Sequence, residues 1–237
     1  MAEATTFTIR YSFRFPDQTE KVFDVELDSQ TGALIQPKRE SYPSWTKLGL
    51  HQCRHCPLNK EEHPQCPVAA SLVDVVDFFY DSHSINKVDV TVQTPHRETH
   101  RKDMLLFPAI SSLIGIHMAS SGCPHLNKLR PMVLHHLPFA DSNETIYRAL
   151  SMYVLAQYFR RKKGLTPDWE LTGLSEIYTN INILNRDFSH RLANESDKEA
   201  SRNAITSLDC FAQMIEFSIT EEMLEELELQ FAGYLSE

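Results

Sequence analysis

Four cysteines between positions 53 and 123 are the residues of this 237-residue chain with the clearest chemical potential. Cys53 and Cys56 form a Cys-x2-Cys pair, and a proline follows Cys56, Cys66 and Cys123. Two thiols at this spacing can bind one metal ion from a single turn, and two further thiolates complete a tetrahedral site. We expect Cys66, just before Pro67, to begin a helix whose backbone N–H groups lower the pKa of its thiol. The sequence therefore predicts a single metal centre formed by Cys53, Cys56, Cys66 and Cys123.

Two kinds of metal centre use four cysteines. Zinc is slightly favoured, because it is redox-inert and stable with four thiolates. An iron–sulfur cluster is the alternative, since such clusters are also held by four cysteines, and Cys-Pro dipeptides occur in some cluster loops. The wide separation of Cys66 and Cys123 in the sequence counts against zinc. A third interpretation is that the cysteines are buried hydrophobic residues without a metal.

Histidines near the cysteines could replace a sulfur ligand or act as bases. The candidates are His51, His55, His63, His117, His125, His135 and His136. We expect the three in the cysteine-rich loop to face solvent, and the adjacent pair at 135–136 to point in opposite directions. His125 is the best substitute ligand because it follows Cys123 by two residues. His117 lies in an apolar segment and is expected to be a hydrogen-bonded core residue.

Little else in the sequence indicates catalysis. There is no G-x-S-x-G, no glycine-rich phosphate loop and no H-E-x-x-H motif. A metal-dependent enzyme with an open coordination position is therefore the weaker interpretation, and we expect a non-catalytic protein. The basic run at 95–102, PHRETHRK, is expected to be a solvated connection, with an anion-binding lip as the alternative. Cys210 lies in an apolar helical pattern and is predicted to be a core residue.

Composition limits the partners and the compartment. The formal net charge is −9, which disfavours general nucleic-acid binding, so a protein is the expected partner of the metal centre. The first residues contain no apolar stretch typical of a signal peptide, and the segment at 104–119 is too short and polar to span a bilayer. A cytoplasmic location is expected, where thiols remain reduced.

Hydrophobic periodicity predicts an α+β fold. Residues 7–15 and 23–27 alternate as the two strands of an antiparallel hairpin, with Phe13 on the buried face. Further strands are expected at 33–35 and 88–92, helices at 67–79, 104–121, 145–163, 174–192, 201–217 and 221–232, and extended chain at 131–139. Residues 1–140 would form an α+β part containing the cysteine-rich loop. Residues 141–237 would form a helical part that either stands alone or continues the same domain.

Overall fold

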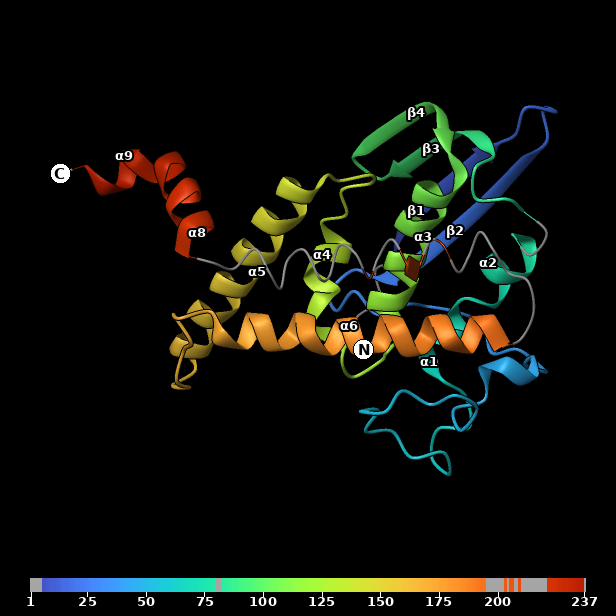
Figure 1. Cartoon of the computed structure of the whole chain (residues 1–237), viewed down its shortest axis with the longest axis horizontal. Coiled ribbons are helices and arrows are strands. Elements are labelled where there is room, and N and C mark those ends of the chain that lie inside the picture. Colours follow the sequence, from blue (N-terminus) through green and yellow to red (C-terminus); the bar gives the residue numbers. More distant parts are fainter. Residues whose placement is uncertain are drawn as a thin grey trace.

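The computed structural model describes residues 6–79, 82–194, 203, 205–206, 209 and 221–236. It has the expected α+β architecture: a four-stranded antiparallel sheet near the N-terminus packs against helices, and a helical part follows (Figure 1). The strands are β1 (Thr6–Arg14), β2 (Glu20–Asp28), β3 (Lys87–Thr94) and β4 (Arg97–Leu105). Their order in the sheet is β2-β1-β3-β4, so β2 and β4 form the edges.

Alternating side chains determine which face of the sheet is buried. In β1, Ile9, Tyr11 and Phe13 are fully buried, while the residues between them face outward. The register places Arg10 opposite Asp24 of β2, and the two side chains form an ion pair with a 2.7 Å N–O distance. The predicted hairpin and its buried face are therefore confirmed.

The basic run at 95–102 does not form a solvated connection as we expected. Residues 95 and 96 form a tight turn, and Arg97 begins β4, an edge strand that pairs with β3. Most of β4 is exposed, so its sequence lacks the apolar alternation that reveals a half-buried strand. Its charged side chains are typical of an edge protected against pairing with other chains. The expected strand at 33–35 is also wrong, because only Leu34 forms an isolated bridge there.

The helices follow the predicted pattern with local differences. They are α1 (Pro67–Ser71), α2 (Val73–Phe78), α3 (Leu106–Ser120), α4 (Arg130–Leu134), α5 (Ser142–Lys162), α6 (Thr172–Asn194), α8 (Glu221–Glu228) and α9 (Ala232–Leu235), with short 3-10 turns η1 (Ser44–Thr46), η2 (Asn127–Leu129) and η3 (Leu229–Phe231). The predicted helix at 67–79 is interrupted at Leu72, and residues 104–105 belong to β4 rather than to α3. Part of the segment expected to be extended, 131–139, is helical in α4.

The long helices α5 and α6 complete the body of the molecule (Figure 1). A capping box between Asp141 and Glu144 begins α5, as the spacing of these residues indicated. Buried residues of α6, including Leu184 and Phe188, belong to the same hydrophobic cluster as the sheet and α3. Residues before and after position 140 therefore contribute to one hydrophobic core.

Cys210 and most of the helix expected at 201–217 lie outside the described residues. Among the helices that the structure does describe, none combines the length and apolar character needed to cross a membrane.

Candidate metal centre

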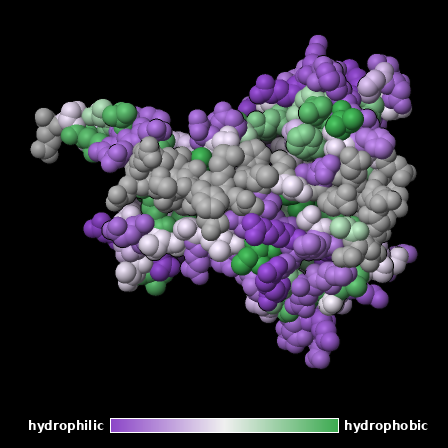
Figure 2. Space-filling view, viewed as in Figure 1, coloured by the Kyte–Doolittle hydropathy of each residue, from purple (hydrophilic) through white to green (hydrophobic). Residues whose placement is uncertain are grey.

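The cysteine loop, residues 47–66, is closed at its base and projects from the body of the protein (Figure 1). Lys47 and Gln65 form an antiparallel bridge, and the Cys66 N–H donates to the Thr46 carbonyl at 2.7 Å. Inside the loop, the Cys56 N–H donates to the Cys53 carbonyl at 2.9 Å. The projecting surface is mostly hydrophilic (Figure 2). The Cys-x2-Cys pair thus lies in a hydrogen-bonded turn within a closed loop.

The structure brings all four predicted cysteines into one neighbourhood. Cys66 and Cys123 are buried, Cys53 and Cys56 are half-buried, and all four are free thiols. The negative charge of an ionised Cys56, Cys66 or Cys123 would reach Cys53, that of Cys56 or Cys66 would reach Cys123, and that of Cys56 would reach Cys66. Burial, followed by these mutual charges, raises the pKa of Cys53 to about 12, and burial raises that of Cys123 to about 11. The neutral thiol is therefore the stable form of both residues in the absence of a cation.

The thiols are close enough to interact electrostatically, but their side chains do not converge. Within the described part of the chain, no three His, Cys, Asp or Glu side chains stand in an arrangement that could hold a metal ion. Neutral thiols have no strong attraction for one another, since the thiolate is the form that binds metal. A centre at this position would require the side chains to move together.

Cys66 is the N-cap of α1, as predicted, but the expected lowering of its pKa is wrong. The backbone N–H groups of Ala69 and Val68 favour its thiolate, yet burial outweighs them and raises the pKa. No side-chain hydrogen bond caps this helix, which has only five residues. The N–H groups of a short helix are a weak substitute for water around a buried charge.

His55 and His125 connect the two separated parts of the thiol cluster. Their rings stack with centroids 3.9 Å apart, and His125 Nε2 lies 3.0 Å from the His55 carbonyl oxygen. His55 Nε2 in turn lies 3.0 Å from the Asn180 carbonyl oxygen of α6. The segment after Cys123, the cysteine loop and α6 are thereby joined through two imidazoles.

The other candidate histidines lie apart from this connection. His51 and His63 are exposed, as expected for residues of a polar loop, and His135 is exposed as well. The same expectation for His55 is wrong, because its ring is half-buried between His125 and α6. His136 turns inward and contacts the Tyr11 hydroxyl, so the adjacent pair does differ in direction. His117 is buried on α3, and burial lowers its pKa to about 4.

Arg191 is the functional residue that the sequence did not reveal. Its side chain is 1% exposed and lies at the base of the cysteine loop. Its guanidinium donates to four backbone carbonyls, at distances from 2.7 to 3.3 Å; the acceptors belong to Trp45, Lys47, Leu48 and His51. Its positive charge also reaches Cys66 and favours the thiolate there. A signal existed, because Arg191 occupies the apolar stripe of α6, seven residues after Leu184.

A second contact between α6 and the cysteine loop comes from Asp187. Its carboxylate accepts hydrogen bonds from the Arg54 side chain, the shortest at 2.7 Å, and from the Arg54 backbone N–H at 2.9 Å. The Arg54 guanidinium lowers the pKa of this carboxyl. Because Arg54 lies between the two cysteines of the pair, the ion pair fixes that turn against α6.

The chain belongs to the family described as "Domain of unknown function (DUF6901)", which matches residues 9–232. It matches no curated protein and no solved structure. The matched range contains the sheet, the cysteine loop, Cys123 and the residues of α6 that contact the loop.

Proposed function

With membership of this family as the premise, we propose that the protein binds one zinc ion through Cys53, Cys56, Cys66 and Cys123. The ion would fix the cysteine loop against the core, and the loop surface would bind a protein partner. The role is structural, since four protein ligands leave no open position for a substrate. A reducing compartment such as the cytoplasm suits this function because it keeps the thiols available for the metal.

The observation that carries the proposal is a buried cation, Arg191, whose positive charge reaches the thiol of Cys66. The carbonyl acceptors of Arg191 satisfy most of its N–H groups, but they do not neutralise its charge. Within the described residues, the Arg191 guanidinium makes no ion pair with a carboxylate. Buried charges are normally paired or bound to metals. Zinc with four thiolates carries a net charge of about −2, so it would complement this guanidinium.

The raised thiol pKa values are compatible with a metal centre. A bound cation deprotonates its cysteine ligands and replaces their mutual repulsion by attraction to the metal. Binding would then draw the sulfurs together and release protons, so the affinity for zinc should increase with pH. Cys53 and Cys56 are half-buried on the loop, whereas Cys66 and Cys123 are buried in the core.

Metal content and absorbance of the purified full chain test the proposal. We expect about one zinc per chain and a colourless solution, with reduced metal after Cys→Ser changes at each of the four positions. Cys210→Ala is the matched control and should retain full metal. A brown protein with broad visible absorbance would instead assign an iron–sulfur cluster to the same cysteines.

Protease sensitivity of the cysteine loop distinguishes one shared centre from a local pair. Cys123→Ser should increase cleavage within the loop, although position 123 is distant from it in the sequence. Full metal and unchanged loop protection in Cys123→Ser would contradict the proposal. Loss of metal in every variant except Cys123→Ser would make His125 the fourth ligand.

A further inference from the structure

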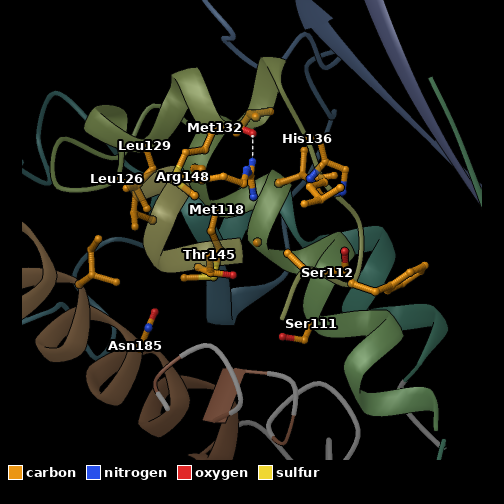
Figure 3. Close-up of a pocket in the computed structure, with 18 of the residues that line it drawn as sticks. Ser111, Ser112, Met118, Leu126, Leu129, Met132, His136, Thr145, Arg148 and Asn185 are labelled. Carbon is orange, nitrogen blue, oxygen red and sulfur yellow. Dashed lines mark hydrogen bonds between the residues drawn. The ribbon is translucent and has the colours of Figure 1, made fainter. Parts of the chain in front are cut away.

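A cavity of about 550 Å³ lies between α3, α4, α5 and α6 (Figure 3). Side chains from α3, η2, α4, α5 and α6 line it, and no cysteine is among the described lining residues. Its walls are mostly apolar; they include Ile116, Met118, Leu126, Met132 and Val133. This volume is typical of sites for small organic molecules.

Arg148 of α5 supplies a positive charge to the cavity wall. Its Nη2 donates to the carbonyls of Met132 and His135, at 2.9 and 3.0 Å. In Figure 3 its guanidinium lies between Met132 and His136. Arg148 forms no ion pair with any acidic residue that the structure describes. The nearby carboxylate of Glu144 is instead occupied by the capping box at the start of α5.

Two cations outnumber the one carboxylate whose charge reaches Arg148, that of Glu144, so the cavity is positive. Arg97 adds a second positive charge that reaches both Arg148 and His136. His136 itself stays neutral, because burial and these two cations lower its pKa to about 3. Tyr178 also lines the cavity and stays protonated, because burial raises its pKa. The polar end of the cavity therefore favours an anion.

Asn185 of α6 supplies a further polar group, whose side-chain oxygen has no hydrogen-bond donor in the described part of the chain. Its side chain is 2% exposed and points toward the cavity in Figure 3. Its Oδ1 atom accepts no hydrogen bond from any described residue. A buried carbonyl oxygen without a donor costs about 1–3 kcal/mol. A ligand hydroxyl that donates to this oxygen would remove that cost.

We propose that this cavity binds a medium-chain hydroxylated fatty acid, with its carboxylate at Arg148, its chain along the apolar wall and its hydroxyl at Asn185. The apolar wall excludes highly polar metabolites, whereas the positive end disfavours amines. A free fatty acid satisfies the wall and Arg148, and the hydroxyl accounts for the otherwise unpaired Asn185. The ligand can be tested whether or not the protein binds a metal.

Calorimetric titration of the full chain with decanoate, decanol and 10-hydroxydecanoate tests the proposal. Charge-assisted hydrogen bonds are strong, so decanoate should bind about tenfold or more tightly than decanol. 10-Hydroxydecanoate, whose hydroxyl lies at the end of the chain far from the carboxylate, should bind more tightly than decanoate, and Asn185→Leu should remove that difference. Absence of decanoate binding, or equal binding of decanoate and decanol, would overturn the assignment.

Variants locate the binding site. Arg148→Gln should weaken decanoate about tenfold or more and bring it close to decanol, whereas the control Arg161→Gln, on the exposed side of the same helix, should bind normally. Because Arg148 also supports two carbonyls, Ala140→Trp provides a second test: it fills the cavity from a loop position. Normal decanoate affinity in a folded Ala140→Trp protein would place the ligand elsewhere.

Discussion

At the scale of single residues, Arg191 shows how one side chain can hold a loop that has little core of its own. Four of its hydrogen bonds go to backbone carbonyls of residues 45–51, a segment that begins in η1 and continues as irregular chain. Its Nε is buried without an acceptor in the described structure. The guanidinium thus donates to four loop carbonyls, but one of its own N–H groups has no acceptor and its positive charge has no carboxylate partner among the described residues.

Replacing Arg191 with methionine tests this role. Met fills a similar space but removes the guanidinium donors from the four carbonyls, of which that of Lys47 keeps the Leu50 N–H, so the free energy of unfolding should fall by about 1–3 kcal/mol. The proposed zinc affinity should fall as well, since the complementary charge is lost. Arg186→Met, an exposed position on the same helix, is the control. Denaturant unfolding and metal titration measure the two effects, and equal behaviour of both variants would contradict the assigned role.

His117 should make stability depend on pH. Burial lowers its pKa from the ordinary value of 6.5 to about 4, so the folded protein keeps the ring neutral where the unfolded chain protonates it. Its contribution is fully present above pH 6.5 and is lost as the pH falls toward 4, with a slope of up to about 1.4 kcal/mol per pH unit. His117→Leu should therefore flatten the dependence of unfolding free energy on pH across this window. Parallel wild-type and variant curves would show that another group is responsible.

At the scale of elements, the β1–β2 hairpin separates a buried face from a solvated one along one strand. Phe13 is fully buried and packs edge-on against Phe23 and Phe79, at centroid distances of 5.9 and 5.2 Å. Arg10, three residues earlier, forms its ion pair with Asp24 on the exposed face. The two positions therefore differ in environment although both belong to β1.

Paired substitutions in β1 should have very different effects. Phe13→Asp removes a buried ring and introduces a charge, so it should lower the free energy of unfolding by at least about 3–5 kcal/mol. Arg10→Ala should change it only slightly, because an exposed ion pair contributes little. Thermal or denaturant melting of both variants measures the contrast. Similar melting of the two proteins would mean that the buried face is assigned wrongly.

The elements also show which parts of the fold the sequence could predict. Strands with one buried face, such as β1, alternate visibly, and the capping box marks the start of α5. Edge strand β4 is polar on both faces, so periodicity could not identify it. Helix α4 has only five residues and begins beside Pro131, which reads equally well as extended chain. Short elements of this kind depend on tertiary contacts rather than on local pattern.

At the scale of the whole molecule, the cysteine loop is held by segments that are distant in the sequence. His125 follows α3, while Asp187 and Arg191 belong to α6. Cysteine types and spacing were enough to propose the four-cysteine centre, which stays a prediction. The sequence could not show that α6 would supply the balancing cation, because an arginine in an apolar stripe finds its acceptors only in the folded chain. Local patterns in the sequence therefore indicate the cysteines of the candidate site but not the arginine that lies beside them.

This arrangement predicts a local rather than global response to metal removal. The amides of Leu48, Cys56 and Cys66 donate hydrogen bonds within or at the base of the loop, and the proposed zinc would hold them closed. A chelator should therefore accelerate hydrogen exchange at these amides, since the loop contributes little to the core. The amides of β1 and β3, which lie inside the sheet, provide the internal control and should keep their protection. Hydrogen exchange measured by mass spectrometry with and without chelator gives both quantities. A uniform increase across the sheet would show that the metal supports the entire fold, and no change in the loop would show that the loop is held by α6 alone.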